Sequence, residues 1–351
     1  MESEGFCMRE ISIKEIGPVR IGQVESREAA TGCTVILCGE DMKNGMKAGL
    51  DVRGGGPASR DSQILNPLMS AETIHAVVLG GGSAFGLGAA NGVMKYLEEH
   101  DIGFDVGVTK VPLVVQSDIF DLTVGDVYTR PDGDMGYAAA KTAMEAPNYR
   151  DGNFGAGCGA TVGKICGMDH CMKTGIGSYA VEVGELRIGA IVVLNALGDV
   201  YNPETGKQIA GLLTEDKKHL RSTTQYMTEC RELSGNKFLE DPSAKDGVSG
   251  GDGSFVGNTT LAAVITNADF AKPQLCKIAG MAHDGYARAI RPVHTSADGD
   301  SIYALSVGTV KADMDLVGIL AADVVAHAIL RAVDNAESAY GYPARRDLTM
   351  N

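Results

Sequence analysis

Residues 261–265 form a short apolar run, Leu-Ala-Ala-Val-Ile, bounded by turn-forming residues. A run of this length without a charge is typical of a buried strand. It is entered through Asn258, Thr259 and Thr260, and residues 234–254, rich in glycine, serine and aspartate, lead up to it. Such a composition favours a mobile loop. The fold must therefore join a segment without regular structure directly to a core strand.

Further strands and helices are predicted on both sides of this run. Short apolar runs rich in β-branched residues predict strands at residues 19–24, 33–38, 74–79, 179–183, 188–194, 261–266 and 302–307. Helical patterns occur at residues 85–99, 135–144, 214–233, 273–290 and 316–333. The two kinds of element are mixed without strict alternation. This order favours packed sheets flanked by helices over a doubly wound parallel sheet.

Composition narrows the class of protein. The chain has 351 residues, 44% of them hydrophobic and 22% charged, which describes a soluble globular protein with a sizeable core. The net charge of −14 repels phosphate backbones and anionic lipid, so we expect neither a nucleic-acid nor a membrane partner. The N-terminal residues are acidic where a signal peptide would be basic and then apolar, which predicts a cytoplasmic protein.

The cysteines predict neither disulfides nor a metal site. All eight are dispersed and no CxxC pair occurs, so reduced thiols are expected. Cys158, Cys166, His170 and Cys171 lie close in sequence, but their spacing matches no standard zinc pattern. We therefore predict no bound metal and no cofactor.

A glycine-rich turn at residues 80–86 follows a predicted strand and precedes a predicted helix. Dinucleotide-binding and serine-hydrolase turns both require glycine where Phe85 stands, which excludes both. The beginning of the helix can still bind an anion or a carboxylate. Gly82 and Ser83 are accordingly candidate contacts for a substrate or an oxyanion, and a purely structural turn is the alternative.

Two further motifs carry charged residues beside glycine. The segment ending in Gly163 and Lys164 fails as a phosphate loop, because its glycine spacing is wrong and Ile165 replaces the magnesium-binding hydroxyl residue. A lysine among packed glycines can lose solvent and have its pKa lowered, whereas an ordinary turn lysine faces solvent.

The second motif is a pair of carboxylates. Asp298 and Asp300 flank one glycine before a predicted strand, and paired carboxylates can orient a cation, an amine or a proton. The remaining ligands of a calcium loop are missing. A simple turn is the alternative, as we expect at Asp132 and Asp134.

Four segments together resemble a known family, and they cover nearly the whole chain in order. They are residues 53–57 (RGGGP), 80–87 (GGGSAFGL), 257–261 (GNTTL) and 290–300 (IRPVHTSADGD). The family contains the L-aminopeptidase/D-alanine esterase-amidases, the β-peptidyl aminopeptidases and the nylon-oligomer endohydrolase. The resemblance implies a four-layer αββα sandwich like that of N-terminal-nucleophile hydrolases. It also implies a precursor that cuts itself once, and a tetramer of processed protomers.

Carried over by motif, the resemblance places the cut between Asn258 and Thr259. The products would be residues 1–258 and residues 259–351 of a single αββα domain, with Thr259 as the nucleophile. Lys164 would match a lysine of the nylon-oligomer branch, and Asn195 the amide that stabilises the oxyanion. Asp298 and Asp300 would match the acidic pair of that same branch.

One position departs from the family pattern. Phe120 stands where members often carry a tyrosine that assists the site, and its surrounding segment is weakly matched.

The chemistry is consistent with this assignment. A threonine hydroxyl is a poor nucleophile unless a base lies beside it. Cleavage before Thr259 would release an α-amine whose reference pKa, about 7.7–8.0, suits that role. The expected substrate is a small peptide or amide. Three functions remain open from sequence: an aminopeptidase, an endo-acting amidase, and an unprocessed relative that acts in binding or assembly.

Overall fold

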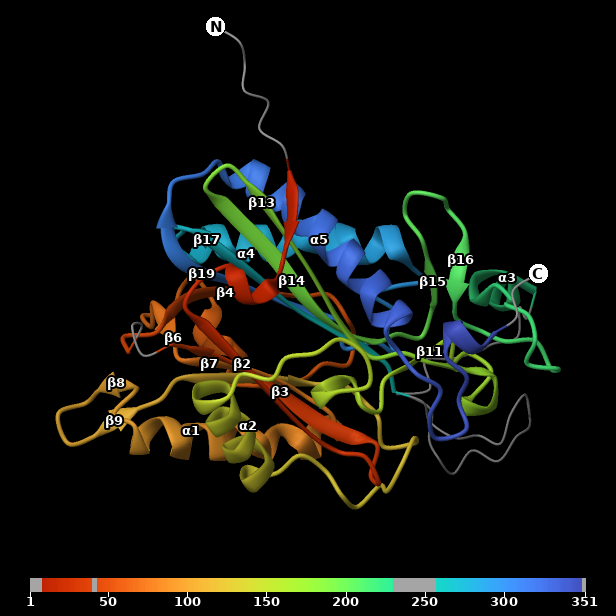
Figure 1. Cartoon of the computed structure of the whole chain (residues 1–351), viewed down its shortest axis with the longest axis horizontal. Coiled ribbons are helices and arrows are strands. Elements are labelled where there is room, and N and C mark those ends of the chain that lie inside the picture. The colour runs from red at the N-terminus through yellow and green to blue at the C-terminus, as the bar shows by residue number, and fades with distance from the viewer. Residues whose placement is uncertain (1–7, 40–42, 230–256, 349–351) are drawn as a thin grey trace, which may run out of the picture.

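The computed structural model describes residues 8–39, 43–229 and 257–348. These residues form two large sheets stacked face to face, with a pair of helices on each outer surface (Figure 1). The αββα sandwich implied by the family resemblance is therefore confirmed. The predicted loop at residues 234–254 lies outside the described residues.

The first sheet contains the strand predicted from residues 261–266. Its order is β1 (Arg9–Ile11), β13 (Ile176–Val183), β14 (Leu186–Asn195), β17 (Thr259–Ala268), β19 (Ser301–Val310), β4 (Met46–Val52) and β6 (Thr73–Ile74). Only β17 and β19 run parallel in this sheet, as far as the described strands show. The strand β17 lies at its centre and is buried over nearly its whole length.

The second sheet has the order β2 (Val19–Ser26), β3 (Thr31–Cys38), β7 (Ala76–Gly80), β10 (Val114–Asp118) and β5 (Ala58–Arg60). The other strands among the described residues are short: β8 (Phe104–Asp105), β9 (Lys110–Val111), β11 (Thr161–Val162), β12 (Met172–Lys173), β15 (Asp199–Tyr201), β16 (Gln208–Ala210) and β18 (Ile290–Arg291).

Helices cover both sheets (Figure 1). They are α1 (Ala89–Glu99) and α2 (Gly133–Glu145) on the second sheet, α4 (Lys272–Ala289) and α5 (Met314–Asp334) on the first, and the peripheral α3 (Thr223–Glu229). One apolar cluster fills the space between the two sheets. A second lies between the first sheet and its helices, and a third lies between the second sheet and its helices. The helix α5 is long and apolar enough to cross a membrane, but 67% of its most apolar window is buried, which is typical of a core helix.

Several predicted boundaries were wrong. The helix expected from Phe85 begins at Ala89, because Ser83–Gly88 form a 3-10 helix. The helix expected over residues 214–233 is described only at Thr223–Glu229. Its first part is a turn, in which the Thr214 hydroxyl bonds Asp216 and competes with helical bonding. Asp132 is not in a simple turn either, because its carboxylate caps α2 at the Met135 N–H.

Candidate active site

Thr259 is the first residue of β17 and lies between two neighbouring strands. On one side it pairs with Asn195, the last residue of β14. On the other side, β17 runs parallel to β19, and a bridge between Asn258 and Asp298 continues the same register beyond the strand ends. Strand pairing with β14 on one side, and the bridge to Asp298 in the loop before β19 on the other, thus hold the Asn258–Thr259 peptide in place.

Two donors converge on the carbonyl oxygen of Asn258. The Thr259 hydroxyl donates to it over 2.5 Å, and the backbone N–H of Gly299 donates over 2.9 Å. The Asn258 N–H donates in turn to the Ala297 carbonyl at 3.2 Å. Asn258 and Thr259 are only 2% and 3% exposed. The threonine hydroxyl therefore lies beside its own preceding carbonyl in a buried and polarised setting.

Lys164 is buried below this peptide, and the solvent-facing alternative is wrong. The Gly163 and Lys164 N–H groups donate to the carbonyls of Gly198 and Leu197, which fastens the turn to the chain just after β14. The ammonium of Lys164 donates to the Asn195 side-chain oxygen at 2.8 Å, to the Asn195 carbonyl at 3.1 Å and to the Gly257 carbonyl at 3.5 Å. All three acceptors are neutral.

Burial without an acidic hydrogen-bond partner changes the protonation of this lysine. Loss of solvent lowers the pKa of Lys164 to about 7, and nearby acidic groups offset the effect only in part. A fraction of the side chain is therefore a neutral amine at neutral pH. A neutral amine bonded to Asn195, the strand partner of Thr259, can take up a proton.

The Asn195 side chain connects three parts of the site. Its oxygen accepts from Lys164 and from the Thr161 N–H at 3.1 Å. Its nitrogen donates to the Phe120 carbonyl at 3.0 Å. The amide expected to stabilise an oxyanion is thus engaged with Phe120 in the uncut chain.

Phe120 lies at the site although its segment matches the family weakly. Its ring packs so closely on Gly257 that a Cβ at residue 257 would lie 2.5 Å from the ring Cγ. The backbone carbonyl of Phe120 accepts a hydrogen bond from the Asn195 side-chain amide, and the ring of Phe120 packs on Gly257, the residue before Asn258. A phenylalanine can pack in this way but lacks the hydroxyl that a tyrosine would bring.

Asp298 and Asp300 are buried on the other side of Thr259. Asp298 accepts from the Thr295 N–H and hydroxyl and from the Leu197 N–H. Burial, and then the charge of Asp300, raise the pKa of Asp298 to about 6. Asp300 accepts from the Thr260 N–H at 2.8 Å. Asp300 therefore holds the residue after Thr259, whereas Asp298 holds the loop before β19 and the chain just after β14.

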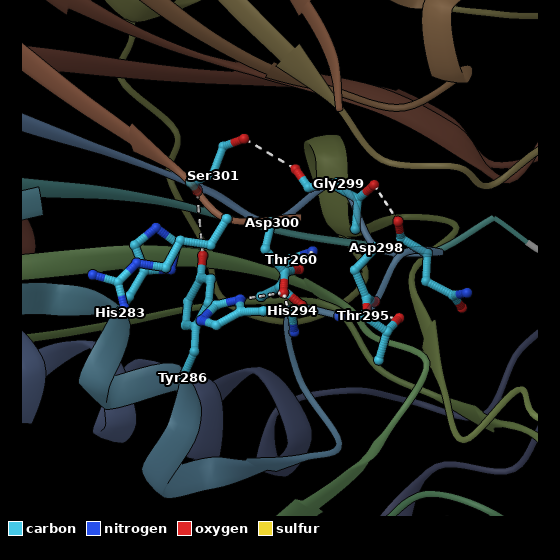
Figure 2. Close-up of polar contacts among 12 residues, drawn as sticks. Thr260, His283, Tyr286, His294, Thr295, Asp298, Gly299, Asp300 and Ser301 are labelled. Atoms are coloured by element: carbon cyan, nitrogen blue, oxygen red, sulfur yellow. Dashed lines mark hydrogen bonds and ion pairs between the residues drawn. The ribbon is translucent and has the colours of Figure 1, made fainter. Parts of the chain in front are cut away.

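Sequence reasoning missed a histidine pair next to Asp300. His294 donates both its N–H and, in the matching tautomer, its ring Nδ1–H to the Asp300 carboxylate, at 3.0 and 2.8 Å. The ring of His283 lies 4.7 Å from that of His294 and contacts the Asp51 carbonyl at 3.1 Å. Figure 2 shows His294 pointing at Asp300 with His283 beside them. The backbone of His294 has a positive φ of 57°, which is uncommon outside glycine. This conformation is visible only in the structure, so the sequence could not indicate it.

Gly82 and Ser83 lie in the turn after β7, which belongs to the second sheet and not to the sheet that contains Thr259. The Gly82 N–H donates to the Asp121 carboxylate at 2.7 Å, and the Ser83 N–H to the Ile119 carbonyl. None of the hydrogen bonds among the described residues joins either of them to Thr259. The turn supports the segment that carries Phe120.

The arrangement suits acyl transfer. A hydroxyl lies against a carbonyl group, an N–H polarises that carbonyl, and a buried amine with a pKa near 7 bonds Asn195, the strand partner of Thr259. These are the parts that attack on an amide requires: a nucleophile, a donor to the oxyanion and a group to carry a proton.

Comparison with known proteins gives the same chemistry. A family model described as peptidase family S58 matches residues 12–346. An aminopeptidase of Mycobacterium leprae, named as uncharacterized, is 34% identical over 95% of this chain and 92% of its own length. The 6-aminohexanoate-oligomer endohydrolase of an Agromyces species is 27% identical over 90% of this chain and 83% of its own length.

Solved structures share the fold. The L-aminopeptidase D-Ala-esterase/amidase of Ochrobactrum anthropi, described as a variant of the Ntn hydrolase fold, matches with a TM-score of 0.66 at 16% identity, over 93% of this chain and 86% of that one. A β-aminopeptidase of a Burkholderia species matches with a TM-score of 0.62 at 17% identity, over 95% and 89%. With this fold, and a family model that spans most of its length, the chain belongs to peptidase family S58 and is a hydrolase of peptide and amide bonds.

Proposed function

We propose that this chain cuts itself between Asn258 and Thr259 and then acts as an aminopeptidase on short peptides or amino-acid amides. The observation that carries the proposal is the position of the Thr259 hydroxyl, 2.5 Å from the Asn258 carbonyl oxygen. A hydroxyl held against the carbonyl of its own preceding residue is poised for attack on that peptide bond.

The first reaction is an N-to-O acyl shift. The Thr259 Oγ forms a bond to the Asn258 carbonyl carbon, and the C–N bond between the two residues breaks. The hydroxyl proton ends on the Thr259 nitrogen, which becomes an amine. Water then hydrolyses the ester, which gives Asn258 a carboxylate and returns the hydroxyl to Thr259.

The second reaction uses the new N-terminus. The α-amine of Thr259 is the base that takes the hydroxyl proton as the oxygen attacks a substrate amide. The leaving amine departs with a proton, and the resulting acyl-enzyme is hydrolysed by water. Asn195 donates to the oxyanion in this step, a contact worth about 3 kcal/mol in comparable sites.

The charged residues have supporting roles in both reactions. Lys164, with its pKa near 7, helps to set the proton balance around Thr259, and its hydrogen bond orients the Asn195 amide. Asp300 holds the backbone after the nucleophile and Asp298 holds the loop before β19, because the chain's own donors occupy their oxygens. Their primary role is thus positioning.

An endo-acting amidase is the second candidate. Both aspartates are bonded to the chain itself, so neither has an oxygen without a donor for the ammonium group of an aminopeptidase substrate. The aminopeptidase remains the first candidate because the 34% identical relative carries that name. We also propose a cytoplasmic homo-oligomer that binds neither nucleic acid nor membrane.

Denaturing electrophoresis tests the self-cleavage. Purified protein should give two fragments, residues 1–258 and 259–351, and N-terminal sequencing of the smaller one should begin at threonine. Thr259→Ala should remain a single inactive chain. An active preparation that stays in one piece would refute the mechanism, whereas an uncut and inactive one would leave the binding or assembly function.

A substrate panel distinguishes the two activities. Aminoacyl-nitroanilides should be hydrolysed by an aminopeptidase, and the same compounds blocked at the amine should not. Equal hydrolysis of blocked and free compounds would favour the endo-acting amidase.

A further inference from the structure

The Asn258 carbonyl already has a backbone donor in the uncut chain. The Gly299 N–H points at its oxygen over 2.9 Å. This bond belongs to the parallel bridge between Asn258 and Asp298, which continues the register of β17 and β19. Sheet geometry therefore aims a peptide N–H at the carbonyl that would be attacked.

The alternative donor is committed elsewhere. The Asn195 side-chain nitrogen bonds the Phe120 carbonyl at 3.0 Å, and its oxygen faces Lys164. The first cut thus needs an oxyanion donor other than the one proposed for substrates. Among the described residues, Gly299 supplies the backbone N–H that is bonded to this oxygen.

We propose that the N–H of Gly299 stabilises the oxyanion formed on Asn258 during self-cleavage. The inference rests on the proposed self-cleaving function. As the Thr259 oxygen attacks, negative charge develops on the Asn258 oxygen, and a donor already aligned with it stabilises the transition state without reorganisation. Self-cleavage and substrate turnover then use different donors, Gly299 for the first and Asn195 for the second.

The neighbours of Gly299 keep its N–H in place. Asp298 and Asp300 on either side are fixed by buried hydrogen bonds, and the Gly299 carbonyl accepts from the Ser301 hydroxyl at 2.9 Å. Figure 2 shows Gly299 between these two aspartates. The hydrogen bonds of the two aspartates thus fix the backbone on both sides of the Gly299 N–H.

Only glycine fits at this position. A Cβ on residue 299 would lie 2.6 Å from the Thr259 Oγ1 and 2.9 Å from the Gly56 carbonyl oxygen. Neither the nucleophile nor that backbone has room to yield without leaving its place. The glycine is required because the nucleophile occupies the space of its side chain.

An amide-to-ester exchange tests the donor directly. Replacing Gly299 by glycolic acid, through nonsense suppression in cell-free translation, puts an oxygen in place of the N–H and adds no side chain, while the Asp298 carbonyl becomes a weaker acceptor for the Gly56 N–H. The control is the same exchange at Gly206, whose N–H donates to the Asn202 carbonyl at 2.8 Å in an exposed turn. Self-cleavage is followed by electrophoresis over time, and the melting temperature of each variant in a Thr259→Ala background reports folding.

The expected result is a slowing of self-cleavage by about 100-fold or more for the Gly299 ester, the range found when one oxyanion donor is lost. The Gly206 ester should cut like the parent chain. Cutting at the parent rate by a folded Gly299 ester would overturn the inference. If Thr259→Ala itself is cut, it is the proposed function that fails.

Two further measurements apply even if the ester variant does not fold. In the uncut Thr259→Ala chain, the Gly299 amide proton should exchange slowly with solvent by nuclear magnetic resonance, and exchange as fast as an unbonded amide would contradict the inference. Gly299→Ala should slow the cut strongly, because its methyl group displaces the Thr259 oxygen. The matched Gly88→Ala should have no effect, because nothing lies within 4 Å of a Cβ at residue 88. Unchanged cutting by Gly299→Ala would contradict the proposed geometry.

Discussion

Asn195 lies directly opposite Thr259, the last residue of one buried strand facing the first residue of the next. The register between β14 and β17 therefore places an amide side chain beside the proposed nucleophile. Lys164 bonds the oxygen of this amide at 2.8 Å, and it also contacts the Gly257 carbonyl at 3.5 Å. Substitutions at Asn195 should accordingly change the pKa of Lys164.

Asn195→Asp should move the pH dependence of self-cleavage upward. A carboxylate 2.8 Å from the Lys164 ammonium favours the charged form, so the pKa of Lys164 should rise above about 7. Cleavage rates measured from pH 5 to pH 10 should increase through a midpoint near 7 in the parent and near a higher pH in the variant. An unchanged midpoint would show that Lys164 does not carry the proton.

Lys164→Met should slow self-cleavage by about 10²–10⁴-fold, the usual range for a lost acid–base group. It should also change stability in a defined pH window. Since burial lowers the pKa of Lys164 from 10.5 to about 7, the unfolded chain binds the extra proton between these values. The free energy of unfolding therefore rises with pH across that window, by at most about 1.4 kcal/mol per pH unit, and is lowest below it.

This stability prediction is best measured in uncut chains. Chemical denaturation of Thr259→Ala should show the rise between pH 7 and pH 10, and the double variant with Lys164→Met should lack Lys164's share of it. Identical pH profiles for the two would contradict the lowered pKa.

His294→Asn should weaken the hold on Asp300 without disturbing the backbone. Asparagine tolerates the positive φ of 57° found at this residue, so the variant removes chiefly the imidazole bond to the carboxylate. Loss of a hydrogen bond to a charged group should cost about 1.5–3 kcal/mol of unfolding free energy and should slow the cut, because Asp300 holds the Thr260 N–H. His219→Asn, at an exposed turn, is the control and should change neither.

Thr260→Val should leave self-cleavage intact, in contrast to Thr259→Ala. The Thr260 hydroxyl is buried and has no hydrogen-bond partner among the described residues. Replacing it by a methyl group of similar shape removes an unsatisfied polar atom, so the free energy of unfolding should stay equal or rise by up to about 1 kcal/mol. Electrophoresis and thermal melting measure the two effects, and an uncut variant would place the nucleophile in doubt.

The sequence predicted the central strands and the four covering helices, because apolar runs and helical spacing report burial directly. The strand β4 was missed although its sequence carries a strand signal, because Met46, Ala48, Leu50 and Val52 alternate with Lys47, Gly49 and Asp51. The candidate site residues were named from motifs, whereas the contacts among them follow only from the structure. Lysine normally faces solvent, so the burial of Lys164 depends on the chain around residues 197–198 closing over it. His294 gave no local signal, because its partner is defined by a backbone conformation that sequence alone does not reveal.

The order of strands in the first sheet has a further consequence. The strands β17 and β19 lie between β14 and β4, so the proposed 93-residue fragment 259–351 would supply the middle of a sheet whose two flanks belong to the other fragment. Its departure would bare two apolar strand edges inside the molecule, and such edges pair readily with other chains. Maturation would thus create an inseparable two-chain protein, in which losing either piece means aggregation rather than a free subunit.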